Sequence, residues 1–347
     1  MKHLDFFSRL LSMDSTSGQE REVALLLSRE LPALLKGASL RMDEVGDGTL
    51  NLLLSWGEPR LVFCTHMDTV PPYIPPVFEP GRVLGRGSCD AKGQIFAMVE
   101  ACERLLEQGC TDFGLLLLSG EETGSWGAKA FSKTGFQAPF LVVGEPTENK
   151  MVSASKGTLS YELVFRGEPF HSGYPQYGLS AVDLFNRFYN ALKAVDWGED
   201  PELGATTWNV GLLRSDNPQN ILSGELGCRL YFRTTFTSHE AVQRWMEMAG
   251  QAGHDGSVLP DDLSGRLEVR FRGGDIPAHY VTLPGLPGGP VAFGSDAPHL
   301  TGFGHRMICG PGSIRCAHRS DEHILLSELE TAVAQYVQIY HILQNHD

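Results

Sequence analysis

Several features that mark common protein classes are missing from this sequence. The seven cysteines are scattered and none forms a Cys-x-x-Cys pair, which favours free thiols in a reducing compartment over a disulfide framework. No apolar run approaches the ~20 residues needed to cross a bilayer, and no continuous apolar segment of the signal-peptide kind precedes Asp14. These absences predict a cytoplasmic protein with no membrane partner.

Familiar catalytic and nucleotide-binding motifs are also missing. There is no H-E-x-x-H zinc motif and no G-x-S-x-G nucleophile motif. Residues 85–93, GRGSCDAKG, resemble a glycine-rich nucleotide loop, but Asp90 stands where the third glycine of G-x-G-x-x-G belongs, and Lys92 is not followed by Ser or Thr. A carboxylate at that position repels phosphate and attracts a metal ion.

Positive charge is scarce. The chain has 28 Lys and Arg against 42 Asp and Glu, a formal net charge of -14. Such a chain repels phosphate backbones, so nucleic acid is not an expected partner, and a cationic small substrate is weakly favoured. With 347 residues, 42% of them hydrophobic, the chain is long enough for two globular domains.

The first part of the chain alternates helix and strand patterns. Apolar runs predict strands, and residues 93–108 carry apolar side chains at helical spacing. The proline-rich residues 70–76 must form a loop. This alternation predicts an α/β layer fold, with strands at 51–55, 61–65, 113–118 and 139–143.

The pattern changes near residue 157. The order becomes β-α-β-β-α-β, which is that of a ferredoxin-like unit, with elements at 158–165, 179–195, 206–213, 225–234, 239–249 and 266–271. We therefore expect an inserted domain over residues 158–273 within a catalytic domain formed by residues 1–157 and 274–347. A closing helix is expected over residues 325–343.

Metal-binding residue types follow the predicted strands of the catalytic domain. His66 and Asp68 follow one strand, Glu121 and Glu122 the next, and Glu145 a third, and strand ends of an open α/β sheet are where such folds place their sites. Together with Asp90 and His318, this set predicts two metal ions and a base, as in a hydrolase that activates water on a metal.

The residues themselves suggest individual roles. In a strand, residues i and i+2 point the same way, so His66 can bind a metal while Asp68 orients its ring. Asp90 has two oxygens and can bridge two cations. One carboxylate of the pair Glu121 and Glu122 can bind metal while the other accepts a proton from water. His318 would complete the ligand set, although the neighbouring His323 is a rival.

These motifs, in this order, resemble the M20 family of dinuclear zinc amidohydrolases and peptidases. The resemblance covers the whole chain and rests on residues 65–70, 85–93, 119–122, 144–147 and 317–318. It implies an α/β catalytic domain of the zinc-peptidase type, with a mixed central sheet flanked by helices, and an inserted ferredoxin-like α+β domain that forms a homodimer.

The resemblance also implies the site. Two divalent ions, zinc or else cobalt, would be bridged by Asp90, with His66 and Glu145 on one ion and Glu122 and His318 on the other. Glu121 would act as general base and then acid, and Asp68 would orient His66. The substrate would meet residues of other segments: His171, supplied by the dimer partner in many members, Asn220, Arg233, Gly310, Gly312 and Ser313.

The resemblance favours one activity and leaves others open. Chain length and the form of residues 90–93 look most like acetylornithine or acetyl-lysine deacetylases, which hydrolyse the amide of an N-acyl amino acid. A dipeptidase or carboxypeptidase is the main alternative, since its substrates also present an amide beside a free carboxylate. A metal-retaining protein without catalysis is a third reading, which the presence of Glu121 disfavours. One departure concerns Tyr231, which stands where the family has an Asp two residues before Arg233.

Overall fold

The computed structural model describes residues 1–46, 48–251, 259 and 263–344, and the chain divides into two compact units. The first unit comprises Met1–Ser153, Tyr280–Gly289 and Ser295–Asp347, and the second comprises Ala154–His279 and Pro290–Gly294. The second unit therefore begins at Ala154 rather than at residue 158, and extends to His279 rather than to residue 273.

A mixed sheet forms the centre of the first unit. Its order is β1-β2-β6-β3-β7-β17, with β1 and β2 antiparallel to their neighbours and the other strands parallel. Strands β3 and β6 are buried along their whole length, as expected for strands covered on both faces. The bounds are β1 Ser39–Gly46, β2 Thr49–Trp56, β3 Leu61–His66, β6 Phe113–Leu118, β7 Ala138–Val143 and β17 Phe303–Ile308.

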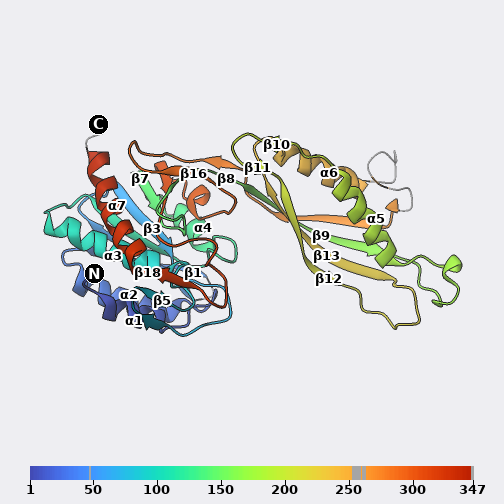
Figure 1. The fold of residues 1–347 in the computed structure, drawn as a ribbon, viewed down its shortest axis with the longest axis horizontal. Helices are drawn as coiled ribbons and strands as arrows, with labels where there is room; N and C mark the ends of the chain where they lie inside the picture. The colour runs from blue at the N-terminus through green and yellow to red at the C-terminus, as the bar shows by residue number, and fades with distance from the viewer. Residues whose placement is uncertain (47, 252–258, 260–262, 345–347) are drawn as a thin grey trace. The chain divides into compact units, whose positions relative to one another are not determined.

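Five helices surround this sheet (Figure 1). They are α1 Leu4–Leu11, α2 Arg21–Leu34, α3 Lys92–Glu107, α4 Trp126–Ser132 and α7 Leu326–Gln344, counted within the residues described. Helix α3 packs against α7 and α1, whereas α2 contacts β2 and α4 contacts β1. The apolar faces of α1, α2, α3 and α7 share one hydrophobic core with the sheet. Helix α3 corresponds to the helical spacing of residues 93–108, and α7 corresponds to the closing helix expected over residues 325–343.

Short strands form two further sheets. Strands β4 Val77–Glu79, β5 Arg82–Leu84 and β18 His323–Leu325 form a sheet of order β18-β5-β4. Strand β8 Met151–Ser155 lies between β15 Ala278–His279 and β16 Gly288–Val291. The expected loop at residues 70–76 is a loop, and the short 3-10 helix η3 spans Ala297–His299.

The second unit is a ferredoxin-like sheet with two helices (Figure 1). In chain order it contains β9 Gly157–Arg166, α5 Ala181–Ala194, β12 Thr207–Arg214, β13 Glu225–Thr234, α6 His239–Gln251 and β14 Leu267–Gly273. The sheet is antiparallel, with the order β12-β13-β9-β14. Buried residues alternate along β9 and β13, and they form a separate core with α5 and α6.

Smaller elements lie between these strands and helices. The hairpin of β10 Glu199–Asp200 and β11 Gly204–Ala205 and the 3-10 helix η1 Pro175–Tyr177 belong to the second unit. Of the helices described, none is long and apolar enough to cross a membrane. The α/β fold with a mixed central sheet and an inserted ferredoxin-like domain is therefore as the sequence predicted.

Candidate metal centre

The parallel strands of the first unit bring the predicted residues to one edge of the sheet. Strand β3 ends at His66, Glu121 and Glu122 follow β6, and Glu145 follows β7. Since parallel strands share their carboxyl edge, side chains that are far apart in sequence meet there. One nitrogen or oxygen atom from each of His66, Asp90 and Glu122 lies within 4.8 Å of the others, close enough for a common metal ion.

His66 is held in a defined orientation. Its Nδ1 lies 3.0 Å from the main-chain oxygen of Asp68, and its Nε2 lies 3.1 Å from Asp90 Oδ1. The ring is 2% exposed. Burial alone would lower the pKa of His66, but hydrogen bonds with Asp68 and Asp90 outweigh it and raise the pKa well above its usual value. The ring therefore sits in a strongly negative environment, which suits a cation.

Asp90 lies between two histidines. Its Oδ2 is 3.4 Å from His318 Nε2, which is also 2.8 Å from Glu122 Oε1. Hydrogen bonds with Asp90 and Glu122 raise the pKa of His318 to about 10. His318 has φ 63, a left-handed backbone conformation that costs a non-glycine residue roughly 1–3 kcal/mol. In this conformation the imidazole of His318 points toward the carboxylates of Asp90 and Glu122.

The rival histidine points elsewhere. His323 Nε2 lies 3.8 Å from Cys316 Sγ, and its Nδ1 lies 2.9 Å from the main-chain oxygen of Asp321. Neither nitrogen is among the atoms that approach Asp90. The structure thus places His318, and not His323, with the candidate ligands.

The remaining carboxylates fit a divalent cation. Glu145 is 4% exposed, and its Oε1 has no hydrogen-bond partner among the residues that the structure describes. Burial, together with the charges of Glu121 and Asp90, raises the pKa of Glu145 well above its usual value. Burial also raises the pKa of Glu121, although His66 partly offsets this. Carboxylates crowded in this way are costly to bury without a neutralising charge, which a metal ion would supply.

Asp68 organises the loop that carries Glu121 and Glu122. Its Oδ1 accepts the N–H of Glu121 at 3.0 Å, and its Oδ2 accepts the N–H of Glu122 at 3.1 Å and the hydroxyl of Ser17 at 2.8 Å. Hydrogen bonds with His66 and these donors overcome the effect of burial and lower the pKa of Asp68. Asp68 therefore stays ionised and fixes both the His66 ring and the two glutamates.

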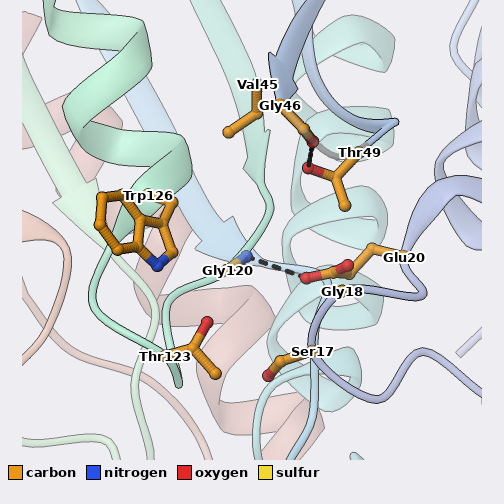
Figure 2. Close-up of a pocket in the computed structure, with 9 residues that line it drawn as sticks. All are labelled: Ser17, Gly18, Glu20, Val45, Gly46, Thr49, Gly120, Thr123 and Trp126. Carbon is orange, nitrogen blue, oxygen red and sulfur yellow. Dashed lines mark hydrogen bonds between the residues drawn. The ribbon is translucent and has the colours of Figure 1, made fainter.

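A pocket lies beside this loop. Figure 2 shows the carboxylate of Glu20 accepting the N–H of Gly120, at 3.1 Å, in a cavity of about 330 Å³. Glu20 is 0% exposed, and burial raises its pKa. Glu20, which immediately precedes helix α2, thus fixes the start of the loop, a contact that no sequence motif indicated. The cavity is lined by Ser17, Gly18, Glu20, Val45, Gly46, Thr49, Gly120, Thr123 and Trp126.

Asp296 and Glu322 are two buried acids next to the candidate ligands that the sequence did not predict. Asp296, 1% exposed, lies near His66 and Asp68, and burial raises its pKa to about 6 while His66 and Ser125 oppose the rise. Glu322, also 1% exposed, accepts N–H groups of the segment that carries Asp90. Both stand in irregular segments, where no periodicity signals burial. The one sequence feature that could have indicated a role for Glu322 at the site is its position four residues after His318.

The second unit brings together two predicted substrate residues. His171 pairs with Ile221 in an isolated β-bridge, and the N–H of Ser172 donates to the main-chain oxygen of Asn220 at 2.9 Å. His171 and Asn220 are exposed. Arg233 lies on β13 with its guanidinium 5.1 Å from the centre of the Tyr231 ring. Tyr231 therefore supports Arg233 by a cation–π contact, in place of the acid that the family resemblance led us to expect.

The loop at residues 310–313, whose Gly310, Gly312 and Ser313 are expected to meet the substrate, is bonded to residues 147–148. The N–H of Gly310 donates to Thr147 Oγ1 at 2.9 Å. Gly312 has φ 81 and its main-chain oxygen accepts the N–H of Glu148, while the Ser313 hydroxyl donates to Glu148 Oε1 at 2.9 Å. This loop holds residues 147–148 next to Glu145.

Comparisons with known proteins show the family to which the chain belongs. The profile of peptidase family M20/M25/M40 matches residues 62–255. A probable carboxypeptidase of Aspergillus terreus is 33% identical over 377 residues, covering 96% of this chain and 84% of that protein. The chain belongs to peptidase family M20/M25/M40. A peptidase M20 domain-containing protein of Schizosaccharomyces pombe is 29% identical, over 92% of this chain and 79% of that protein.

Two solved structures share the fold. A tripeptidase from Staphylococcus aureus superposes with a TM-score of 0.78 at 22% identity, covering 98% of this chain and 97% of that one. An M20 family metallo-carboxypeptidase from Sulfolobus solfataricus gives a TM-score of 0.73 at 16% identity, covering 97% and 98%. The protein is thus an M20 hydrolase of a family that uses divalent metal ions, usually zinc, with a candidate metal-binding group in place.

Proposed function

We propose that this protein is a metal-dependent peptidase that hydrolyses the amide bond beside the free carboxylate of a small peptide. The observation that carries the proposal is the group formed by His66, Asp90 and Glu122 within 4.8 Å, with Glu121 next to it in sequence. The names of the relatives, probable carboxypeptidase and tripeptidase, support a peptide substrate over an N-acyl amino acid.

The proposed centre would hold two divalent ions. Asp90 turns Oδ1 toward His66 and Oδ2 toward His318, so each oxygen faces a different imidazole, as a bridging ligand requires. His66 and Glu145 would hold one ion, and Glu122 and His318 the other. A set of imidazole and carboxylate donors suits zinc, and cobalt is accepted by the same donor types.

The chemistry divides between the ions and the protein. Bound divalent ions lower the pKa of water and polarise a carbonyl group. Glu121 accepts the proton of the attacking water and then delivers it to the leaving amine. Asp68 keeps His66 in one orientation and holds the Glu121 and Glu122 N–H groups, so the base stays fixed during the proton transfers.

The second unit would recognise the substrate. Arg233 is proposed to pair with the substrate carboxylate, Asn220 to donate to it, and His171 to stabilise the oxyanion. In this proposal two copies of the chain form a homodimer through their second units, and each copy supplies His171 to its partner's metal centre. The support is the exposure of His171 and Asn220 and the family resemblance.

A deacylase of N-acyl amino acids, such as acetylornithine, is the second candidate. The sequence form of residues 90–93 favours it, because it looks like that of the deacetylases. The peptidase and the deacylase both act on an amide beside a free carboxylate. Arg233 and Asn220 could therefore bind the carboxylate of either substrate.

A substrate panel separates the two candidates. Zinc- and cobalt-loaded protein would be tested on dipeptides, on the same dipeptides with amidated C-termini, and on N-acetyl and N-succinyl amino acids. The proposal expects the highest kcat/KM for free dipeptides or tripeptides, and a loss with C-terminal amidation. Preference for an N-acyl amino acid would establish the deacylase instead, and preference for amidated peptides would refute the role of Arg233.

A further inference from the structure

Asp90 is carried by a segment whose backbone is tied to a single carboxylate. Glu322 Oε1 accepts the N–H groups of Gly87 at 2.9 Å, Cys89 at 3.1 Å and Asp90 at 3.1 Å. Its other oxygen, Oε2, accepts from Arg86 Nη1. One side chain therefore accepts three backbone N–H groups of residues 87–90 and a guanidinium, and the N–H of Asp90 itself is among these donors.

The ion pair is fully enclosed. The side chains of Arg86 and Glu322 are 2% and 0% exposed. Enclosing such a pair is costly unless the geometry is good and the remaining donors and acceptors are satisfied. Both conditions hold here, because Glu322 accepts the three N–H groups and Arg86 Nε donates to the main-chain oxygen of Pro72 at 3.3 Å. An uncompensated charge at either position would instead disturb the segment.

Glu322 also links the segment that carries His318 to the segment that carries Asp90. It follows His318 by four residues and immediately precedes β18, which pairs with β5 from His323↔Leu84 to Leu325↔Arg82. The main-chain oxygen of Glu322 accepts the N–H of Gly85 at 2.9 Å. The segment of His318 and the segment of Asp90 are thus fastened together at Glu322, through its backbone and its side chain.

We propose that Glu322, with Arg86, is a positioning residue of the metal centre: it sets the place of Asp90 relative to His318 without touching the metal. This inference rests on the proposed function only in taking Asp90 and His318 as ligands of the same centre. Loss of the Glu322 carboxylate frees three N–H groups and Arg86, so the Asp90 segment relaxes and the two ligands no longer meet an ion in the required geometry.

Zinc binding to metal-free protein tests this inference without any substrate. The variants are Glu322→Gln, which keeps the side-chain volume and one acceptor oxygen, and Glu322→Ala, which keeps neither. The matched control is Glu328→Gln, because Glu328 Oε2 also accepts a backbone N–H, that of Leu325 at 3.1 Å, but has no contact with the Asp90 segment in the part of the chain that is described. Affinity is measured by competition with a chelator of known zinc affinity, and folding by melting of the metal-free protein.

Loss of a residue that orients a metal ligand typically costs 10–100-fold in metal affinity. We expect a loss of about that size in Glu322→Gln and a larger one in Glu322→Ala, with no change in Glu328→Gln. A purely structural role would lower the melting temperature of the metal-free protein but leave the zinc affinity of its folded fraction unchanged, and this result would overturn the inference. An equal loss in the control would overturn it as well.

A second variant covers the case in which Glu322→Gln does not fold. Arg86→Lys keeps the positive charge but not the planar fork, and it leaves Glu322 free to hold its three N–H groups. We expect a smaller loss of zinc affinity than in Glu322→Gln, and wild-type affinity in Arg86→Lys would then refute the contribution of the pair. If the wild-type protein itself binds no zinc, the proposed function fails, and that outcome is distinct from every variant result.

Discussion

The candidate metal ligands and the candidate substrate residues are built in different ways. In the first unit, the candidate ligands His66, Asp90 and Glu145 are 2%, 5% and 4% exposed, and the orienting Asp68 is 0% exposed. The side chain of His318 is 46% exposed but is held by contacts with Asp90 and Glu122. In the second unit, His171 and Asn220 are exposed. Arg233 is partly buried, with its guanidinium over a tyrosine ring.

In the proposal, the residues of the first unit carry out the reaction and those of the second unit recognise the substrate. Buried groups whose neighbours already hold them lose little freedom when the reaction occurs, which is the condition for efficient proton transfer and charge stabilisation. The exposed His171 and Asn220 of the second unit remain open to solvent, and in the proposal they meet a substrate or a second chain. Variants of the first unit should therefore change kcat or metal affinity, whereas variants of the second should act through substrate binding or through assembly.

The largest effect is expected for Glu121→Gln. The amide cannot accept a proton, so kcat should fall by at least the roughly 10²–10⁴-fold that a general base contributes, while the metal content stays unchanged. Turnover and metal analysis are measured on the same preparation. Glu30→Gln, at a surface carboxylate that pairs with Arg9, is the control. Unchanged kcat in Glu121→Gln would remove Glu121 from the role of base.

His171→Ala tests whether recognition requires a second chain. Loss of an oxyanion donor costs roughly 10²–10³-fold in kcat, and we expect a fall of that order. A heterodimer of one Glu121→Gln chain and one His171→Ala chain would contain one site with both residues intact. About half of the wild-type activity should then return, since one of two sites is complete.

The heterodimer result is informative in either direction. Activity assays on purified heterodimer, with each homodimer as a control, measure the return. A heterodimer as inactive as its parents would show that His171 acts within its own chain or takes no part, and a chain that stays monomeric at assay concentration would contradict the proposed homodimer.

His318→Ala and His323→Ala compare two neighbouring histidines. We expect His318→Ala to lose one ion per chain, because its Nε2 faces Asp90 and Glu122, and the affinity loss should exceed the roughly 10–100-fold caused by changing a residue that only orients a ligand. His323→Ala should keep both ions. Metal analysis by mass spectrometry decides the matter, and loss of metal in His323→Ala alone would reverse the assignment.

The sequence was sufficient for those parts of the site that regular elements deliver. His66, Glu121, Glu122 and Glu145 follow apolar strands, so their clustering at one sheet edge could be expected before the fold was known. The ferredoxin-like insertion was predictable for the same reason, since the alternation along residues 158–165 and 225–234 reports a half-buried sheet.

Other parts depend on contacts that no local pattern records. Glu322 and Glu20 are acids in irregular segments, and their burial becomes evident only when the distant residues 86–90 and 120 provide donors. Gly310 looked available to a substrate because its partner, the Thr147 hydroxyl, lies 163 residues away. Long-range hydrogen bonds of this kind determine which polar groups remain free for a substrate. No periodic pattern in the sequence predicts them.

Metal removal should make the first unit sensitive to pH. In metal-free protein the folded pKa values of Glu145, Glu121 and His66 are raised, so protons bind the folded state more tightly than the unfolded state. The stability that these groups contribute is fully present below their unfolded pKa values, 4.5 for Glu and 6.5 for His. It is lost as pH rises through the raised folded values.

The melting temperature of metal-free protein should therefore fall from pH 6 to pH 8. Zinc replaces the lost protons, so the difference between zinc-loaded and metal-free protein should grow over the same range. Zinc at 100 to 1,000 times its dissociation constant adds about 2.7–4.1 kcal/mol. Scanning calorimetry with and without a chelator measures both curves, and a zinc effect that shrinks as pH rises would contradict the assignment.

The smallest effect is expected at Tyr231, where this chain departs from the family's usual acid. The ring lies under the Arg233 guanidinium at 5.1 Å and is 38% exposed. A cation–π contact at an exposed site contributes about 0.5–1 kcal/mol, so Tyr231→Leu should raise KM for a free dipeptide by roughly 2–5-fold and leave kcat unchanged.

Tyr231→Phe keeps the aromatic face and should behave as wild type, while Tyr231→Asp supplies a carboxylate and should also support Arg233. Amidated dipeptides should show no difference among these variants, because they offer Arg233 no carboxylate. Equal KM values for Leu and Phe variants on the free dipeptide would show that the tyrosine ring does not position Arg233 for substrate.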